Sequence, residues 1–333
     1  MIHLRDIKGA RARIEKHVLR TPLLPLKFGP ADAYVKCENL QRGGAFKCRG
    51  AFNKILSLPP KARRRGVVAY SSGNHAQAVA LAAQSLGIPA CIVMLDQSVP
   101  HKVEGTRGYG AEVIFGGNSS EAIKERAEAI AKERGYALVP PFNDPLIMAG
   151  QGTAGLEILE DLPDVKAVVV QIGGGGLSSG IATAIKESKR NVKVFGAEPR
   201  GAAKMFESVR KGELVTLPGT TTIADGLKPV RAGDLTFAQV RKYVDDICLV
   251  SDDEMLGATQ RLILKEKLVV EPSGAASFAA ILSGRLNLPK GKVVAVLSGG
   301  NADVVAILQG TVSALPTGAA APATDRFPAV NPT

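Results

Sequence analysis

Four consecutive glycines, Gly173 to Gly176, are the part of the sequence that most clearly predicts a binding site. They follow a strand-like apolar run at 167–172 and precede a segment with helical spacing. A tight turn needs only one or two glycines, whereas four let backbone N–H groups converge on an anion at the positive end of the following helix. This tetraglycine loop therefore predicts a phosphate-binding site.

The sequence around the tetraglycine loop argues against two common kinds of phosphate site. A P-loop ends in Gly-Lys-Ser or Gly-Lys-Thr, which is absent from this chain. The dinucleotide motif Gly-x-Gly-x-x-Gly also fails, because its last position falls on Ser178 or Ser179. Glu198, at the end of the next predicted strand, still has the position of an acidic ribose ligand. A nicotinamide dehydrogenase therefore stays open as an alternative.

Two further loops after predicted strands present serine and asparagine. Ser71-Ser72-Gly73-Asn74-His75 follows the run 67–70, and Ser298-Gly299-Gly300-Asn301 follows the run 293–297. Either loop alone is ordinary turn sequence. In an open parallel sheet, however, ligands bind where loops leave the carboxyl ends of strands. Together with the tetraglycine loop, the two loops predict one shared crevice.

A lysine beside an aromatic residue is the remaining candidate for covalent chemistry. Lys47 follows Phe46 and lies between Gly43-Gly44 and Gly50, in a stretch that a cofactor can approach closely. A single lysine is usually a solvated charge, but a desolvated lysine is the type that forms Schiff bases. Lys47 is therefore the candidate Schiff-base residue.

Alternating strand and helix patterns must position these loops. From about residue 65 to residue 297, short β-branched runs alternate with longer stretches of helical spacing. This alternation predicts βαβ units, and hence an α/β fold with a mostly parallel sheet covered by helices. Helices are predicted near 120–134 and near 252–267, the second opening on a capping box that starts at Ser251. The clearest predicted strands are Gly66–Tyr70, Ala90–Leu95, Glu112–Phe115, Ala167–Ile172, Lys193–Ala197 and Lys292–Leu297.

Composition limits the class of protein. The chain has 333 residues, 45% of them hydrophobic, and its 4 cysteines show no CxxC spacing, so we expect a globular protein with reduced thiols. No apolar run approaches the roughly 20 residues of a membrane helix, and no signal-peptide core is found, so the expected location is the cytoplasm. The net charge of +11 lacks the signatures of nucleic-acid binding. Neither nucleic acid nor membrane is an expected partner.

Taken together, these segments resemble the fold-type II enzymes that depend on pyridoxal 5′-phosphate (PLP). Within that class they are most similar to the threonine/serine dehydratases (ammonia-lyases) and serine racemases, from about residue 5 to residue 310. The resemblance implies two open parallel-sheet domains with covering helices, as in the tryptophan synthase β chain. The shared motifs are Phe46-Lys47 with Arg49-Gly50, Ser71 to Gln77, Ala149 to Thr153, Gly173 to Gly176, Ile223 to Gly226, Glu271 to Gly274 and Ser298 to Asn301.

The resemblance also implies how PLP, the expected cofactor, is held. Lys47 is expected to form the Schiff base, with Phe46 beside the pyridine ring. Asn74 is expected to bond the ring hydroxyl and Ser298 the ring nitrogen, where a neutral serine in place of a carboxylate suits elimination. The phosphate is expected to bind the backbone of Gly173, Gly174, Gly175, Gly176 and Leu177.

The substrate side follows from the same resemblance. The substrate carboxylate is expected to bind to the loop that follows the run 67–70 and is formed by Ser71, Ser72, Gly73, Asn74 and His75. Ser72 is also expected to face the cofactor from the side opposite Lys47, as a second acid–base group if the enzyme racemises. Lys47 is expected to remove the α-proton, and loss of the β-hydroxyl from L-threonine, or also L-serine, gives a 2-oxo acid and ammonia.

Two positions depart from the family pattern. Many members have serine where this chain has Ala45. Racemase-like members bind a cation with a glutamate after a strand, a backbone carbonyl and an aspartate. Glu198 and Ala202 match the first two, but Lys204 replaces the aspartate. The Lys204 ammonium is expected to pair with Glu198 in place of the ion, so we expect no metal.

The family architecture implies a small substrate-loop domain at 66–143, inserted into a large PLP-binding domain at 1–65 and 144–316. Residues 317–333 are rich in alanine, proline and threonine and are predicted to be a disordered tail. A homodimer or homotetramer is expected from the resemblance.

Several alternatives to the threonine/serine dehydratase remain open from the sequence. A serine or threonine racemase, or a dehydratase for 3-hydroxyaspartate or phenylserine, stays open as an alternative, because the sequence does not give the size of the pocket that Phe142 and residues 226–230 would form. A nucleotide-binding dehydrogenase and a non-catalytic binding protein are the alternatives from other classes. A non-catalytic role is disfavoured because Lys47, Asn74 and Ser298 all hold the functional residue type.

Overall fold

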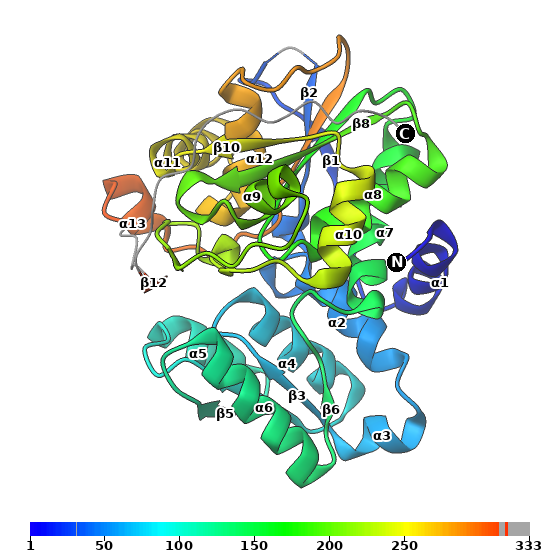
Figure 1. Cartoon of the computed structure of the whole chain (residues 1–333), viewed down its shortest axis with the longest axis vertical. Coiled ribbons are helices and arrows are strands. Elements are labelled where there is room, and N and C mark those ends of the chain that lie inside the picture. The colour runs from blue at the N-terminus through cyan, green and yellow to red at the C-terminus, as the bar shows by residue number, and fades with distance from the viewer. Residues whose placement is uncertain (31, 313–316, 319–333) are drawn as a thin grey trace.

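Two sheets, each covered by helices, build the two lobes of the chain (Figure 1). The computed structural model describes residues 1–30, 32–312 and 317–318. Both main sheets are parallel except at one edge, where β1 runs antiparallel to β2. The predicted α/β class is confirmed. Apart from 317–318, the predicted tail lies outside the described residues.

Helices alternate with strands along most of the chain. The α-helices are α1 (Leu4–Ile14), α2 (Lys47–Leu56), α3 (Pro60–Arg65), α4 (Asn74–Leu86), α5 (Pro100–Gly108), α6 (Ser120–Arg134), α7 (Pro145–Asp161), α8 (Gly176–Ser188), α9 (Lys204–Lys211), α10 (Asp234–Tyr243), α11 (Asp252–Arg261), α12 (Pro272–Leu282) and α13 (Val304–Gln309). Short 3₁₀ turns are η1 (Glu38–Leu40), η2 (Arg42–Gly44), η3 (Arg200–Ala202) and η4 (Asp225–Leu227), and η5 (Leu262–Glu266) is a π-helical turn.

Six strands in the order β1-β2-β11-β7-β8-β10 form the sheet of the large lobe. They are β1 (Leu23–Pro25), β2 (Ala33–Lys36), β11 (Val293–Val296), β7 (Ala167–Gln171), β8 (Lys193–Pro199) and β10 (Asp246–Val250). The central strand β7 is buried on both faces: Val168 and Val170 pack toward α7 and α8, whereas Val169 packs toward α11 and α12. Burial on both faces explains its unbroken apolar sequence. Because β7 and β11 are neighbours, the loops that follow them leave the sheet side by side.

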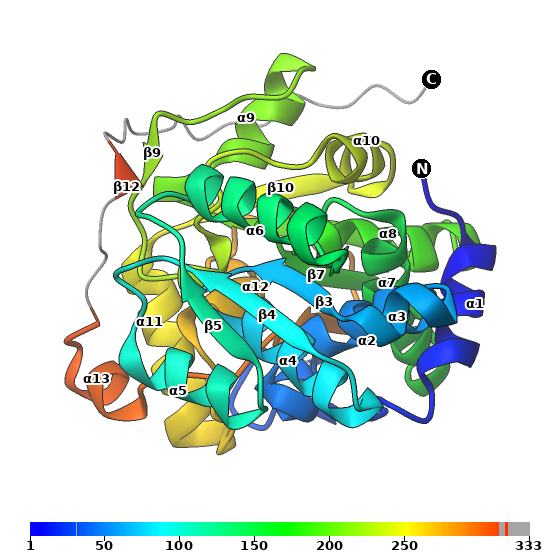
Figure 2. The same ribbon diagram turned by 90° about the horizontal axis from the view of Figure 1, so that it is seen from below.

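Four strands in the order β5-β4-β3-β6 form the sheet of the small lobe. They are β5 (Glu112–Phe115), β4 (Ala90–Met94), β3 (Val67–Tyr70) and β6 (Ala137–Leu138). Val67 and Ile92 pack in the core shared with α4 and α5, whereas Val68 and Val93 pack with α6. Figure 2 shows α6 on one face of this sheet and α4 with α5 on the other.

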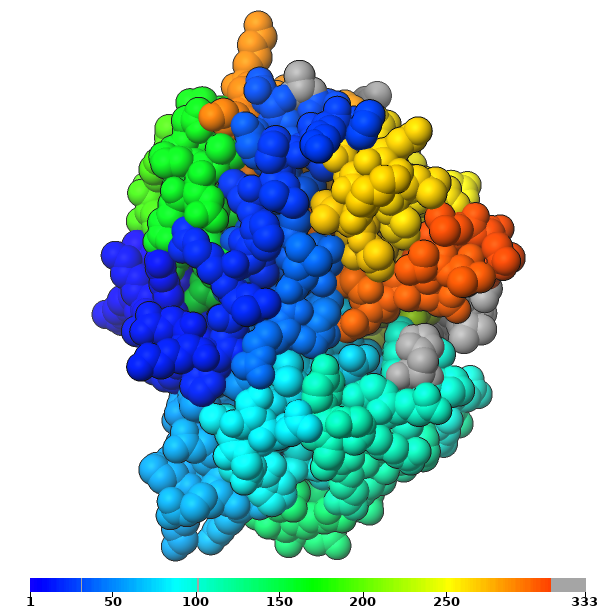
Figure 3. Space-filling model, turned by 180° about the vertical axis from the view of Figure 1, so that it is seen from behind, coloured from blue at the N-terminus to red at the C-terminus, as the bar shows by residue number. Residues whose placement is uncertain are grey.

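The small lobe joins the rest of the molecule through α2 and α4, which pack together in one core. Seen from behind, the small lobe lies beneath the N-terminal residues and the C-terminal helices (Figure 3). The domain limits at 66–143 stay a prediction, although the second sheet falls between Val67 and Leu138. Among the described helices, none combines the length and the apolar character that crossing a bilayer requires.

The observed elements differ from the predicted ones at a few places. Of the strands in the two main sheets, β1, β2, β6 and β10 were not predicted, and β8 extends to Pro199, two residues beyond the prediction. The helix predicted near 252–267 ends at Arg261 as an α-helix and continues as the π-helical turn η5. Lys267 then adopts φ 62°, a left-handed conformation that stops the helix. The helix predicted near 120–134 is α6, with Gly135 in left-handed conformation at its end.

Candidate active site

Lys47 is the first residue of α2 and faces the junction of the two lobes. The backbone N–H of Phe46 donates to the carbonyl of Ser298, 3.0 Å away, so the loop after β11 fixes the start of this helix. The Lys47 ammonium donates to the carbonyl of Pro141 at 2.7 Å and lies 5.2 Å from the centre of the Phe46 ring. The lysine, its aromatic neighbour and the loop of Ser298 are therefore brought together.

The surroundings of Lys47 make its amine easier to deprotonate. Burial lowers the pKa of Lys47 to about 8, while the negative charge of Glu271 partly opposes that shift. Desolvation disfavours the ammonium form, as it does in lysines that form Schiff bases. Near neutral pH a larger fraction of Lys47 is then an uncharged amine than in an ordinary exposed lysine, and the uncharged amine is the form that attacks a carbonyl carbon.

The tetraglycine loop lies between β7 and α8, where the structure leaves no room for side chains. A β-carbon on Gly174 would lie 2.3 Å from the ring of Phe142, and Gly175 has φ +94° at the N-cap of α8. The first N–H groups of α8 have no partner within the helix and carry the positive end of its dipole. Glycine is thus required by the packing, and the loop can bind a phosphate group with its backbone.

Residues 141–142 connect the tetraglycine loop with Lys47. The carbonyl of Pro141 accepts the lysine hydrogen bond, and the next residue, Phe142, packs against both Gly174 and Gly176. Leu177, which follows the tetraglycine loop, is buried in the first turn of α8. The predicted phosphate loop and the predicted Schiff-base lysine therefore flank the same short segment.

Asn74, the first residue of α4, has both atoms of its amide bonded across the lobe junction. Its Nδ2 donates to Oε1 of Glu271 at 2.6 Å, and its Oδ1 accepts from Nδ2 of Asn301 at 2.9 Å. Asn301 also donates to the carbonyl of Gly43. The two loops that present asparagine, predicted to share a crevice, do meet in the structure.

Glu271 is a site residue to which sequence reasoning gave no role. It lies at the N-cap of α12, its backbone N–H donates to the carbonyl of Gly299, and its side chain is buried. Burial raises the pKa of Glu271 to about 7, against the opposing effects of Lys102, Asn74 and Lys47. The available signal was its place in Glu-Pro-Ser-Gly directly after the apolar run 268–270.

The side chains of the loop after β3 bond within the small lobe. Ser72 Oγ accepts from the N–H of Leu95 at 2.9 Å and from Ser98 Oγ at 2.7 Å, and Ser71 Oγ accepts from the N–H of Gly73. The buried ring of His75 contacts the carbonyl of Val139 through Nε2 at 2.8 Å. Among the described residues, no hydrogen bond joins these side chains to Lys47 or to the tetraglycine loop. Their predicted roles toward the substrate stay predictions.

A second contact between the lobes lies beside the tetraglycine loop. Lys102 on α5 forms an ion pair with Asp225 at 2.9 Å, and the N–H of Gly226 donates to Ser273 Oγ at 2.8 Å. A β-carbon on Gly173 would lie 2.7 Å from the carbonyl of Gly226. The turn η4 therefore packs directly on the tetraglycine loop.

Glu198 is not free to bind a ribose. Its side chain is fully buried and forms an ion pair with Lys204 at 2.8 Å, so the predicted pairing of these two residues is confirmed. That pairing removes the observation that kept the dehydrogenase alternative open.

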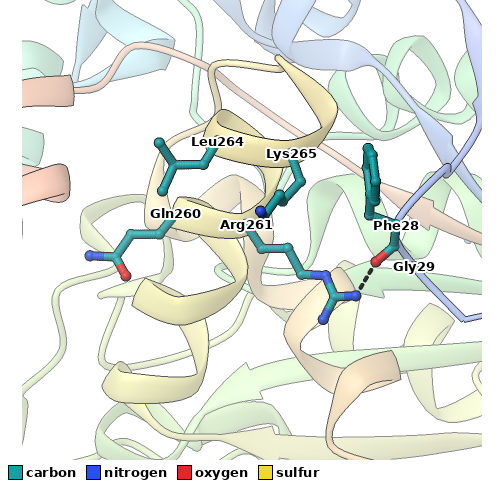
Figure 4. A pocket seen from close by; sticks show the side chains of 6 residues that line it. All are labelled: Phe28, Gly29, Gln260, Arg261, Leu264 and Lys265. Atoms are coloured by element: carbon teal, nitrogen blue, oxygen red, sulfur yellow. Dashed lines mark hydrogen bonds between the residues drawn. The ribbon is translucent and has the colours of Figure 1, made fainter.

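A surface pocket of about 580 Å³ lies elsewhere on the large lobe (Figure 4). Arg261 on α11 extends across it to the carbonyl of Phe28. None of the predicted site residues lines this pocket, which is formed by Phe28, Gly29, Gln260, Arg261, Leu264 and Lys265.

These features fit one kind of cofactor. A desolvated lysine binds an aldehyde, a glycine loop at a helix N-terminus binds a phosphate, and Phe46 offers a ring face beside the amine. PLP carries an aldehyde, a phosphate and an aromatic ring, so the residues present fit it. The fold and the features of the site are thus those expected of a PLP-dependent enzyme on a two-lobed α/β scaffold.

Comparison with known proteins agrees with this class. The family model described as "Pyridoxal-phosphate dependent enzyme" matches residues 14–299, and the chain belongs to this family. An L-threonine ammonia-lyase of Thermotoga maritima is 47% identical over 308 residues, which cover 91% of this chain and 77% of that protein. The catabolic L-threonine dehydratase TdcB of Escherichia coli (strain K12) is 42% identical over 91% of this chain and 94% of its own length.

Solved structures show the same architecture. The structure of maize serine racemase superposes with a TM-score of 0.89 at 39% identity, covering 92% of this chain and 96% of that one. The serine racemase of Dictyostelium discoideum gives a TM-score of 0.84 at 37% identity, covering 91% of this chain and 99% of that one. The predicted fold-type II architecture and the predicted PLP dependence are therefore confirmed.

Proposed function

We propose that this chain is an ammonia-lyase that eliminates water from L-threonine, and also from L-serine, with PLP bound at Lys47. The observation that carries the proposal is the Lys47 amine beside the segment 141–142 that packs on the tetraglycine loop. The similarity to the L-threonine ammonia-lyase of Thermotoga maritima supports the choice of substrate.

The residues divide the work of elimination between them. The backbone of Gly173 to Leu177 binds the cofactor phosphate, and Asn74 and Ser298 contact its ring. Bound PLP supplies an electron sink for the pair of electrons left at Cα. Lys47 Nζ takes the Cα proton, and its lowered pKa suits a base that works near neutral pH. The β-hydroxyl leaves with a proton as water, and water then hydrolyses the dehydrated product to 2-oxobutanoate and ammonia when the substrate is L-threonine.

The loop after β3 completes the substrate side of the proposal. Ser71, Ser72 and the backbone N–H groups at Gly73, Asn74 and His75 bind the substrate carboxylate. This requires Ser72 Oγ to exchange its contact with Ser98 for one with the substrate. The loop belongs to the small lobe, at 66–143 in our domain assignment.

A racemase is the second candidate function. The similarity to maize serine racemase, with its TM-score of 0.89, is the observation that favours it. In that case Ser72 is the second acid–base group, acting on the face opposite Lys47. The discriminating observation is D-serine formed from L-serine.

We propose that the enzyme works in the cytoplasm as a homodimer or homotetramer. Sedimentation velocity of the PLP-bound protein measures this directly. A single species at the mass of the 34.8 kDa chain would contradict the oligomer.

An absorption spectrum combined with a 2-oxo acid assay tests the function. Purified protein with PLP is expected to show the visible band of a lysine-bound cofactor, and L-threonine is expected to yield 2-oxobutanoate. Lys47→Ala is expected to abolish both, whereas Lys61→Ala, at an exposed lysine of α3, changes neither. No band in the wild-type protein would overturn the site, and a band without 2-oxobutanoate would overturn the lyase activity.

A further inference from the structure

Lys204 provides a fully buried ammonium that contacts four separate oxygen atoms. Its Nζ lies 2.8 Å from Oε1 of Glu198 and donates to the carbonyl of Ile172 at 3.2 Å. It also donates to the carbonyls of Ala202 and Leu227, each at 3.1 Å. Both Lys204 and Glu198 have no exposed surface. Four segments of the chain thus converge on one nitrogen.

The atoms around this nitrogen are of the kind that surround a bound cation. An ammonium has three N–H donors and no acceptor, and every neighbour named above is an acceptor. Burial opposes both charges, lowering the pKa of Lys204 and raising that of Glu198, while each partner's charge opposes these shifts. Glu198 also accepts from the N–H groups of Met205 at 3.0 Å and Phe206 at 2.8 Å. These bonds favour the carboxylate form, so we assign the charged pair.

The residues bonded to Lys204 are those that shape the tetraglycine loop. Ile172 directly precedes Gly173, and Leu227 follows Gly226, whose carbonyl packs on Gly173. On the other side of the loop, a β-carbon added to Gly175 would lie 3.0 Å from the methyl group of Met205 in α9. One buried cation therefore fixes the end of β7, the turn η4 and the start of α9 around the loop.

A metal ion does not fit where the Lys204 ammonium lies. A glutamate with several carbonyl oxygens is the ligand set that hard cations prefer. In this chain Nζ already contacts those oxygens. Among the described residues, moreover, no group of three or more histidine, cysteine, aspartate or glutamate side chains is arranged to hold a metal ion.

We propose that Lys204 is a positioning residue whose ammonium serves as a built-in cation for the phosphate-binding loop. It keeps the carbonyls of Ile172 and Leu227 in place, so that the tetraglycine loop binds PLP without a divalent cation at this position. The proposal rests on the proposed function only through PLP, since it concerns cofactor affinity and not the substrate.

PLP affinity of the apoprotein, measured by absorbance titration with and without Mg²⁺, is the test. Wild-type protein dialysed against EDTA is expected to bind PLP equally well in both conditions. Lys204→Met, which keeps length and removes charge, is expected to weaken PLP binding by about tenfold or more, the size of effect known when partners that orient metal ligands are lost. Lys186→Met is the matched control, because Lys186 forms an ion pair with Asp245 at 2.6 Å near the other end of α8.

Two further variants keep the test decisive. Lys204→Met leaves Glu198 buried without its partner and can reduce folding, so far-UV circular dichroism accompanies each titration. The double variant Glu198→Gln with Lys204→Met buries no charge, and it is expected to fold and still bind PLP weakly. Lys204→Asp pairs a new carboxylate with Glu198, and its PLP affinity is expected to become dependent on Mg²⁺.

Two outcomes would overturn the proposal. One is wild-type protein that loses PLP affinity in EDTA and regains it with Mg²⁺. The other is a folded double variant that binds PLP as tightly as the wild-type protein does. A wild-type protein that binds PLP but forms no 2-oxobutanoate would instead contradict the proposed function and leave this titration interpretable.

Discussion

Asn74 Nδ2 lies 2.6 Å from Glu271 Oε1, although the two residues are 197 positions apart in the chain. The contact joins the first residue of α4, in the small lobe, to the residue before α12, in the large lobe. Burial raises the pKa of the Glu271 carboxyl to about 7. A carboxyl group that titrates near neutral pH is thus held where the lobes meet, within the electrostatic influence of Lys47.

Glu271→Gln is expected to remove an ionisation near neutral pH from the profile of kcat/KM. Glutamine still accepts the hydrogen bond from Asn74 but cannot titrate, so the limb centred near a pKa of about 7 disappears. Initial rates of 2-oxobutanoate formation, measured between about pH 5.5 and 9, test this. Glu213→Gln, at an exposed glutamate, is the control. An unchanged limb in Glu271→Gln would assign the ionisation to another group.

The rate at which apoprotein captures PLP is expected to rise with pH around a midpoint near 8. The ammonium of Lys47 cannot attack an aldehyde, and burial lowers its pKa to about 8, so the reactive amine forms well below the pH at which an ordinary lysine deprotonates. Growth of the visible band after mixing measures the rate. A rate that instead climbs through about pH 10.4, the ordinary lysine value, would contradict the desolvation of Lys47.

Local patterns were sufficient to propose the candidate site residues that lie on single segments. The tetraglycine loop and the two loops that present asparagine could be singled out because glycine runs and strand ends are visible in the sequence itself, and Lys47 because it lies beside an aromatic residue and between glycines. The contact between Asn74 and Glu271 could not, since it depends on how two separate sheets are placed relative to each other. The ion pair between Lys102 and Asp225 is hidden for the same reason.

Side-chain direction was the other limit of the sequence analysis. The sequence does not show that the Ser72 hydroxyl is bonded by Leu95 and Ser98, which follow the neighbouring strand β4. Strand β10 was missed because its apolar run, Ile247 to Val250, is short and adjoins two aspartates. It is formed by pairing with β8, a tertiary contact that local propensity does not encode.

Gly174→Ala is expected to weaken PLP binding while leaving the fold intact. The added β-carbon would lie 2.3 Å from the ring of Phe142, and displacing Phe142 also disturbs the carbonyl of Pro141 that binds Lys47. Overpacking of this kind costs about 1–3 kcal/mol. That range corresponds to roughly 5- to 150-fold in PLP affinity. Gly108→Ala, where an added β-carbon meets nothing within 4 Å, is the control, and equal affinities of the two variants would contradict the packing argument.

Arg49→Met is expected to destabilise the whole fold, and more so at alkaline than at acidic pH. The fully buried guanidinium bonds Glu38 at 2.7 Å and Glu157 at 2.6 Å, so its removal leaves Glu38 without its cationic partner and Glu157 with Lys36, and costs about 3–5 kcal/mol. Although burial works to raise it, the pKa of Glu157 is lowered by Arg49 and Lys36. Without Arg49 that pKa rises in the folded state, and protonation at lower pH relieves part of the penalty.

Urea unfolding followed by far-UV circular dichroism at about pH 5.5 and 8 measures the effect of Arg49→Met. The loss of stability relative to wild type is expected to be smaller at the lower pH, because there the folded variant binds protons that the wild-type fold excludes. Arg231→Met removes an exposed ion pair with Asp234 and is expected to change stability by less than about 1 kcal/mol. Equal destabilisation by Arg49→Met at both pH values would mean that lost packing, and not unbalanced charge, is the cause.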